Sequence, residues 1–444
     1  MSLVDRRELE ILADALEVLN EGFEHLPETA ADLDTAAIAA VLQRVARRMH
    51  DNYPYHHPRY AGQMLKPPHP VARLAYALAL WLNPNNHALD GGRASSAMEK
   101  ECVAQIGAML GLDRPLGHLC SGGTMANLEA LWAAGRLSPG RVLASAQAHY
   151  THRRLSEVLK LEFAEVATDV QGRMDLAALE SALAAGGVGT VVVTLGTTGL
   201  GAIDPLADVL ALRERHGFRV HVDAAYGGYF RLAPSLAPAT ARHLERTNDA
   251  DSIVIDPHKH GLQPYGCGCV LFRDPGVGAL YRHDSPYTYF SSDELHLGEI
   301  SLECSRPGAA AVALWATHQL LPPVPGGTFA ANLARSLAAA RALWQALGRS
   351  ERFFTLAEPE LDIVVFGVAA PDAATASEHA RTLFARAAER DLHLALIELP
   401  VDMVAARHPE LVANRATVTC LRSCLMKPEH LDAVEDIAAT LAAL

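Results

Sequence analysis

The middle of the chain, about residues 91–320, alternates apolar strands with helices, and this pattern constrains the fold most strongly. Strands are expected in VVVTLG at 191–196, FRVHVDAA at 218–225 and DSIVIDPHK at 251–259. Strands that are apolar throughout and connected by helices typically form a mostly parallel sheet with helices on both faces. The sequence therefore predicts an open α/β domain over 91–320.

One helix of this zone carries boundary signals at both ends. Asp204 and Pro205 are predicted to supply its N-cap and first-turn proline, because these residue types favour those positions. The helix is expected to end before Gly217, since glycine readily adopts the left-handed backbone conformation found just beyond helix ends.

The two flanking zones differ from the middle one. Residues 1–90 open with helices and continue into an irregular stretch rich in Pro, His and Tyr at 50–70. Such a segment cannot fold alone, so we expect it to pack over the main domain or a partner subunit. Residues 321–444 are predicted to form a small α+β domain with an antiparallel sheet. Its expected elements are helices at 328–347, 372–390 and 428–444 and strands at 361–368, 392–399 and 415–422.

Composition narrows the class of protein. The formal net charge is −13 and no basic run occurs, which argues against binding to nucleic acid or anionic membranes. The N-terminus lacks a signal-peptide pattern, and the apolar stretch at 71–82 is too short to span a bilayer, so a cytoplasmic location is expected. Seven cysteines without zinc-site spacing indicate reduced, buried thiols and no metal.

Two charged residues follow expected strands. A carboxylate at Asp223 could keep a pyridine nitrogen protonated, or it could cap the next turn. An amine at Lys259 could act as a nucleophile, or it could form a structural ion pair with Asp256. Ligands bind beyond the carboxyl ends of the strands in open α/β sheets, so the two residues together favour a site.

Three weaker signals fall in the same zone. The loop SGGT at 121–124 begins a helix and could bind a phosphate through its backbone N–H groups, although plain turns have the same composition. Thr197 and Thr198 follow the first strand, within a glycine-rich turn. His149 could stack on a flat ring, but most histidines in a chain with 21 of them are structural.

These motifs together resemble the group II pyridoxal-dependent amino acid decarboxylases. The most specific ones, in the family's order, are SGGTMANLEALW at 121–132, HVDAAYGG at 221–228 and DPHKHG at 256–261. The resemblance runs from NPNNH at 83–87 to LRSCLMKP at 421–428. It implies fold-type I, with a mostly parallel seven-stranded sheet, a small C-terminal domain and an N-terminal segment that packs on the second subunit. It also implies a homodimer with active sites at the subunit interface.

The resemblance implies a pyridoxal 5'-phosphate (PLP) site. Lys259 would hold the cofactor as an internal aldimine, and Asp223 would pair with the ring nitrogen. His149 and Ala225 would pack on opposite faces of the ring, while His258 would lie near the phosphate. The other cofactor residues that it implies are Ser121, Gly122, Gly123, Thr124 and Thr197 or Thr198.

Further positions follow from the resemblance. Arg422 matches an arginine that contacts the substrate carboxylate in some members. The stretch 281–299 is similar to the family's mobile loop, where Tyr287, or else Tyr289, would return a proton to the substrate carbon. Ser305 matches the point where the chain returns after this loop, and Gly308 would lie near the phosphate of the neighbouring subunit.

The implied reaction is α-decarboxylation of an L-amino acid to an amine. The segment HKHGLQPYGCG at 258–268 is most similar to bacterial tyrosine decarboxylases and sphingosine-phosphate lyases. An aromatic substrate such as tyrosine is therefore expected first, an acidic one next and diaminobutyrate third. The alternatives are a carbon–carbon lyase or aldehyde synthase on the same scaffold, and a catalytically silent binding homologue.

Overall fold

A computed structural model describes residues 5–27, 33–281 and 296–444. Tyr287 and Tyr289 lie outside these residues. None of the described helices is both long and apolar enough to cross a membrane. All seven cysteines are free thiols, and six of them are buried as expected, whereas Cys304 is exposed.

The larger of two sheets has seven strands in the order β1-β7-β6-β5-β4-β2-β3. Only β7 runs antiparallel to its neighbours, so the sheet is mostly parallel as predicted. The strands are β1 (Leu116–Cys120), β2 (Arg141–Ser145), β3 (Phe163–Val166), β4 (Val188–Thr194), β5 (Arg219–Asp223), β6 (Ser252–Ile255) and β7 (Gly268–Phe272).

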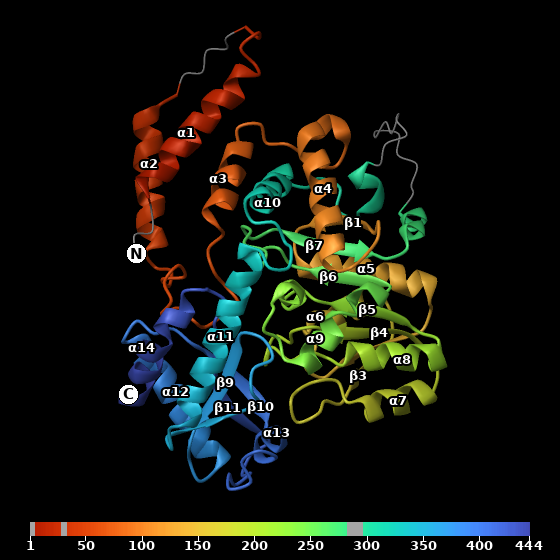
Figure 1. The fold of residues 1–444 in the computed structure, drawn as a ribbon, viewed down its shortest axis with the longest axis vertical. Helices are drawn as coiled ribbons and strands as arrows, with labels where there is room; N and C mark the ends of the chain where they lie inside the picture. The colour runs from red at the N-terminus through yellow and green to blue at the C-terminus, as the bar shows by residue number, and fades with distance from the viewer. Residues whose placement is uncertain (1–4, 28–32, 282–295) are drawn as a thin grey trace.

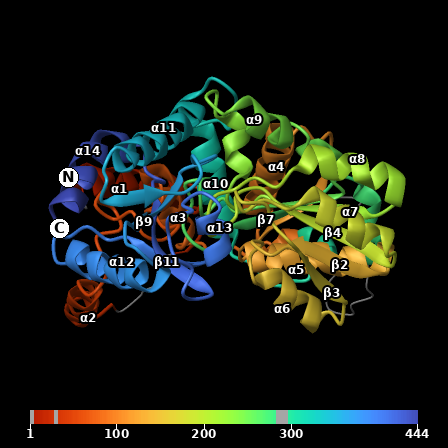
Figure 2. The same cartoon turned by 90° about the horizontal axis from the view of Figure 1, so that it is seen from below.

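Helices cover both faces of this sheet, with α5 and α6 on one face and α4 and α8 on the other (Figure 2). The apolar side chains of the central strands are consequently buried from both sides, which explains their continuous hydrophobic sequences. The helices around this sheet are α4 (Arg93–Met109), α5 (Gly123–Leu137), α6 (Thr151–Val158), α7 (Leu176–Ala184), α8 (Leu206–His216), α9 (Pro238–Leu244) and α10 (Gly308–Leu320).

Of the two predicted boundaries of α8, the C-terminal one is confirmed and the N-terminal one is wrong. Gly217 adopts the left-handed conformation at the helix end, with φ of 69°. The predicted N-cap at Asp204 is wrong, because Pro205 occupies the cap position. The Asp204 carboxylate turns instead into the core, where it accepts hydrogen bonds from the backbone N–H groups of Met174 (2.7 Å) and Thr194 (2.8 Å).

The strand expected at 251–259 is shorter than predicted. It ends at Ile255, and the next four residues form a turn in which the Lys259 N–H donates to the Asp256 carbonyl at 2.9 Å. This turn, rather than a strand end, brings Lys259 to the edge of the sheet.

The smaller sheet is fully antiparallel, as expected, with the order β10-β11-β9-β8. Figure 1 shows it below the larger sheet, next to α11 and α12. Its strands and helices are α11 (Thr328–Gly348), β8 (Phe353–Thr355), β9 (Ile363–Val368), α12 (Ala373–Ala388), β10 (Ala395–Pro400), α13 (Val401–Ala405), β11 (Thr417–Cys424) and α14 (His430–Ala443).

The N-terminal helices are α1 (Arg6–Glu21), α2 (Thr35–Met49) and α3 (Pro70–Ala79). Helix α3 packs against α10, but neither α1 nor α2 buries a residue, and the pair projects away from the body (Figure 1). The irregular stretch between α2 and α3 runs along the smaller sheet. There the Ala61 N–H donates to the His393 carbonyl at 2.9 Å, and the Cys424 N–H donates to the Ala61 carbonyl at 2.8 Å.

Candidate active site

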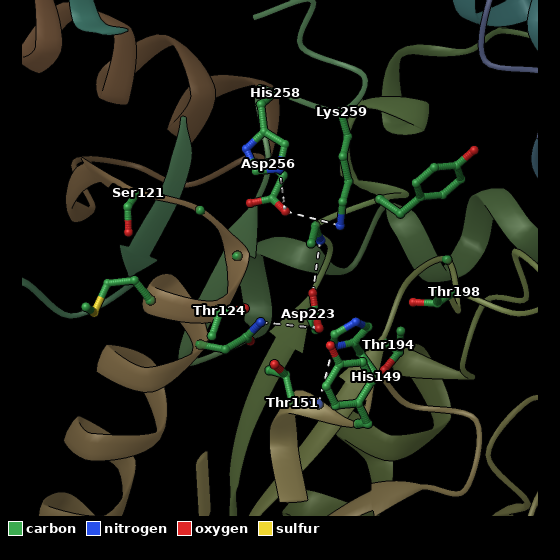
Figure 3. Close-up of a pocket in the computed structure, with 18 residues that line it drawn as sticks. Ser121, Thr124, His149, Thr151, Thr194, Thr198, Asp223, Asp256, His258 and Lys259 are labelled. Carbon is green, nitrogen blue, oxygen red and sulfur yellow. Dashed lines mark hydrogen bonds and ion pairs between the residues drawn. The ribbon is translucent and has the colours of Figure 1, made fainter. Parts of the chain in front are cut away.

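A cavity of about 410 Å³ lies at the carboxyl ends of the central parallel strands and the start of α5. Figure 3 shows Lys259 and Asp223 entering it from neighbouring segments. Nine of the residues expected at a cofactor line it, namely Ser121, Gly122, Gly123, Thr124, His149, Asp223, Ala225, His258 and Lys259. The fold thus gathers residues that are up to 138 positions apart, from 121 to 259 (259 − 121 = 138).

Asp223 is the last residue of β5, and its carboxylate is buried among hydrogen-bond donors. His152 Nε2 lies 2.9 Å from Oδ2, and Asn127 Nδ2 lies 3.4 Å from the same atom. The Ala225 N–H donates to Oδ1 at 3.1 Å. Burial by itself would raise the pKa of Asp223, but the hydrogen bond from His152 and the charge of Lys259 hold it well below the usual range.

The Asn127 side chain is oriented by a second buried histidine. His221 Nε2 lies 2.8 Å from Asn127 Oδ1, and His221 Nδ1 lies 2.9 Å from Ser252 Oγ. Burial lowers the pKa of His221 to about 3, so its ring is neutral. Because Oδ1 can only accept, Nε2 carries the ring proton and Nδ1 accepts from the Ser252 hydroxyl. Each hydrogen bond in the series from Ser252 through His221 and Asn127 is therefore donated in the direction of Asp223.

The Lys259 amine lies 3.1 Å from Asp256 Oδ2. The carboxylate of Asp256 is buried, whereas the Lys259 side chain keeps 23% exposure at the cavity. Lys259 thus forms the ion pair with Asp256 and also reaches the open space of the cavity. His258 Nε2 lies 3.5 Å from the same Asp256 oxygen, and its Nδ1–H donates to the Cys267 carbonyl at 2.8 Å.

The loop at 121–124 forms a close-packed cradle at the start of α5. Gly122 has φ of 150°, and a Cβ on Gly268 of β7 would lie 2.6 Å from the Gly122 backbone. A Cβ on Gly123 would lie 2.7 Å from Asp256 Oδ2. The Ser121 N–H donates to the Glu303 carboxylate at 2.9 Å, so this loop already binds an anionic oxygen. Free N–H groups at a helix start suit a phosphate in the same way.

His149 and the threonines border the cavity on its other side. Burial lowers the pKa of His149, whose Nδ1 accepts from the Thr151 N–H at 3.3 Å. Thr198 lines the cavity, but Thr197 does not. The Thr197 side chain is fully buried and its hydroxyl accepts from the Ala202 N–H at 3.1 Å. Of the two alternatives, the structure therefore favours Thr198.

Arg422 lies on β11 and contacts Thr198, a residue that lines the cavity. Its Nη1 donates to the Thr198 carbonyl at 3.0 Å, and its Nη2 donates to Gln63 Oε1 at 2.7 Å. The guanidinium is thus held by groups that border the site. Gly308 begins α10 and is buried, with its N–H 2.8 Å from the Pro84 carbonyl.

Three residues that bind the predicted site residues were not themselves predicted as parts of the site: Asn127 and Asp256 line the cavity, and His152 lies behind it. Asn127 follows Gly123 by four positions on α5, and His152 follows His149 by three. The first spacing places Asn127 on the same side of α5 as Gly123, whereas His149 precedes α6 and shares no helix with His152. Helical periodicity was therefore an available signal for Asn127 alone.

Comparison with known proteins assigns the class. Residues 132–369, more than half of the chain, match the family described as "Pyridoxal-dependent decarboxylase conserved domain". The chain belongs to this family. It is an enzyme, a PLP-dependent carboxy-lyase of fold-type I that decarboxylates an amino acid.

Curated relatives divide between two substrates. A "Probable L-tyrosine/L-aspartate decarboxylase" of Methanothermobacter thermautotrophicus is 30% identical, over 69% of this chain and 82% of the relative. An "L-tyrosine decarboxylase" of Enterococcus faecium is 28% identical, over 68% and 66%. An "L-aspartate decarboxylase" of Thermococcus kodakarensis is 29% identical, over 74% and 84%.

Solved structures share the fold. Mouse CSAD in apo form has a TM-score of 0.78 at 21% identity, covering 98% of this chain and 99% of that chain. Oryza sativa TDC with PLP and tryptamine has a TM-score of 0.78 at 18% identity, covering 100% and 99%. The predicted fold-type I architecture is therefore confirmed.

The residues present fit PLP. Asp223 receives three donors, which leaves its Oδ1 able to accept one more hydrogen bond, as a protonated ring nitrogen requires. The Lys259 amine reaches the same cavity, and the loop at 121–124 begins α5, where the N–H groups of the first helical turn can bind a phosphate. These three groups match the three polar ends of the cofactor.

Proposed function

We propose that the chain removes the α-carboxylate of an L-amino acid, with Lys259 as the covalent attachment point of PLP and Asp223 at its ring nitrogen. The observation that carries this assignment is that both side chains reach one cavity, from the turn after β6 and from the end of β5. PLP, when bound, supplies an electron sink for the pair of electrons that the departing carboxylate leaves behind.

The other cofactor residues follow from their positions around the cavity. His149 and Ala225 are proposed to pack on the two faces of the ring, and the neutral state of His149 suits such a contact. His258 and the 121–124 cradle, which comprises Ser121, Gly122, Gly123 and Thr124, are proposed to hold the phosphate. Thr198, rather than Thr197, is the threonine proposed beside the ring substituents.

Three further residues are assigned to the site. Tyr287 is proposed to return a proton to the α-carbon, with Tyr289 as the alternative. Arg422 is proposed to attract the substrate carboxylate, since its Nη1 bonds the carbonyl of the cavity residue Thr198. The neighbouring subunit's Gly308 is proposed to lie near the phosphate.

For the substrate we propose an aromatic L-amino acid, tyrosine first. Support comes from the tyrosine decarboxylases among the relatives and from Tyr150, an exposed ring on the cavity wall that could contact another ring. Aspartate is the second candidate, favoured by the buried cation Arg422 and by the aspartate decarboxylases among the relatives.

The deciding experiment incubates the PLP-loaded enzyme with each of the twenty amino acids and with diaminobutyrate, and measures both carbon dioxide and amine. Tyrosine turnover with equal amounts of both products is expected. Aspartate turnover alone would replace the aromatic proposal by the acidic one. An aldehyde product, or cleavage of a phosphorylated amino alcohol without carbon dioxide, would overturn decarboxylation as the reaction.

The role of Lys259 has its own test. The variant Lys259→Ala is expected to lose turnover and to release its cofactor after borohydride treatment and denaturation, whereas the wild type retains it covalently. Lys160→Ala, an exposed lysine on another segment, serves as the control. Multiple turnovers by Lys259→Ala at the wild-type rate would contradict the assignment.

We further propose that the enzyme is a cytoplasmic homodimer in which residues 1–90 pack on the partner subunit, with domain boundaries near 90 and 320. The support is that α1 and α2 bury nothing in their own chain while they expose apolar side chains. Exposed apolar surface of this extent is typical of a subunit interface. The buried free thiols are consistent with a reducing compartment.

A further inference from the structure

His152 occupies a buried position behind the cavity, on the second residue of α6. Its side chain is completely buried, and its Nε2 lies 2.9 Å from Asp223 Oδ2. A histidine placed there for packing alone would be replaceable by an apolar residue. This one instead directs one ring nitrogen at the carboxylate that faces the cavity.

The direction of the hydrogen bond follows from the chemistry of both partners. An ionised carboxylate can only accept, so His152 Nε2 must carry the proton that lies between His152 and Asp223. His152 Nδ1 is buried without a hydrogen-bond partner in the part of the chain that the structure describes. Because an unpaired N–H is costly in such surroundings, Nδ1 is expected to be the bare nitrogen of the ring.

Two further donors converge on the same carboxylate. Asn127 donates to Oδ2, and its orientation is set by His221 and Ser252 behind it. The Ala225 N–H takes one position on Oδ1. Of the side-chain donors, His152 is the nearer by 0.5 Å (3.4 − 2.9), so it is the principal side-chain group that stabilises the negative charge of Asp223.

We propose that His152 is a positioning residue for the cofactor: it keeps Asp223 ionised and aimed into the cavity, and thereby keeps the ring nitrogen of PLP protonated. Without the histidine, Asp223 becomes the more basic partner and the shared proton moves from the ring nitrogen toward the carboxylate. A protonated ring nitrogen makes PLP the stronger electron sink, so His152 acts on the reaction through Asp223 without touching the substrate.

The direct readout is the ¹⁵N NMR signal of PLP labelled at its ring nitrogen, bound to the enzyme and followed against pH. In the wild type we expect the signal of a protonated nitrogen. His152→Phe removes the donor at similar volume, and His152→Asn has an amide too short to reach Asp223. Both are expected to lower the pKa of the ring nitrogen by about one unit or more, a tenfold change in the ratio of protonated to neutral nitrogen at a given pH.

Matched variants make the experiment specific. His152→Gln places an amide N–H near the position of Nε2 and should largely restore the wild-type signal. His118 is an equally buried histidine paired with a carboxylate, 3.0 Å from Glu129, so His118→Gln measures what the loss of any such pair does. If His152→Phe does not fold, the comparison of His152→Asn with His152→Gln still decides the question, because the two amides differ only in reach.

The inference rests on the proposed position of Asp223 at the ring nitrogen, and Asp223→Asn separates the two. If Asp223→Asn leaves the ¹⁵N signal unchanged, the position of Asp223 itself is wrong. If Asp223→Asn changes the signal but His152→Phe and His152→Asn do not, only the role of His152 is refuted. An equal change in His118→Gln would refute it as well.

Discussion

Lys427 is a buried lysine that contacts the irregular N-terminal stretch, and Lys66 is a partly buried lysine within that stretch. The Lys427 amine donates to the Tyr60 carbonyl at 2.6 Å, and the Lys66 amine donates to the Met426 carbonyl at 3.2 Å. Burial lowers the pKa of Lys427 to about 7, with a further lowering by the charge of Lys66 that Glu429 partly offsets. Burial likewise lowers the pKa of Lys66 to about 8. Folding therefore favours the neutral amines.

This lowering predicts a pH-dependent stability. Between about pH 7 and 10.5 the unfolded chain binds more protons at Lys427 than the folded chain, so the free energy of unfolding rises with pH. The rise is expected to be on the order of 1 kcal/mol per pH unit in that window. Lys427→Met should reduce this slope and leave the contribution of Lys66 above about pH 8, measured by urea unfolding at several pH values.

The control for this measurement is Lys160→Met, because Lys160 is exposed. This variant should keep the wild-type slope. A slope that is unchanged in Lys427→Met would mean that Lys427 stays charged in the folded protein, in spite of its burial.

At the scale of elements, the cradle at 121–124 depends on how closely β7 approaches it. Gly268 lies at the start of β7, and a Cβ there would come within 2.6 Å of the Gly122 backbone. Gly268→Ala must therefore push the loop outward, and overpacking of this kind costs about 1–3 kcal/mol. If the loop holds the phosphate, the dissociation constant of PLP should rise roughly 5- to 150-fold.

Fluorescence titration of the apoenzyme with PLP measures this constant. Gly348→Ala is the matched control, because the nearest atom to its Cβ, Thr355 Oγ1, is 3.7 Å away at the end of α11. If Gly268→Ala folds and binds PLP with wild-type affinity, the loop at 121–124 does not hold the phosphate.

The elements themselves were largely predictable. The strand pattern at 191–196 and the helix at 328–347 correspond to β4 and α11 within a few residues. Short-range hydrophobic periodicity carries this information. The strand expected to include Lys259 was too long, because the turn at 256–259 is formed by contacts with β7 and its Cys267 neighbour, which periodicity does not report.

At the scale of the molecule, the α1–α2 pair is the part of the fold whose apolar side chains a single chain does not cover. Neither helix has a buried residue, and α2 is exposed along its whole length, with apolar side chains that include Leu42 at 60% and Val45 at 49% exposure. If a partner subunit covers these side chains, a charged residue at either position would be buried in the interface without a partner. The double variant Leu42→Glu/Val45→Glu is therefore expected to shift the protein from dimer to monomer in sedimentation velocity, with loss of turnover.

Val412→Glu is the control, since Val412 is 60% exposed but lies in the loop before β11, away from the N-terminal helices. This variant should remain dimeric. A dimeric and active Leu42→Glu/Val45→Glu would show that the α1–α2 pair is not the interface. A wild type that sediments as a monomer at assay concentration, with full activity, would overturn the dimer itself.

By itself the sequence determined the fold class, the cofactor and most of the cavity, because strand-end positions such as Asp223 and local loops such as 121–124 are encoded within a few residues. Tertiary structure alone decided which groups act on them. His152 of α6 and Asn127 of α5 meet at the Asp223 carboxylate only after the sheet has formed, and His221 of β5 orients Asn127 there. A hydrogen bond between residues 71 positions apart, as for His152 and Asp223, leaves no periodic trace in the sequence.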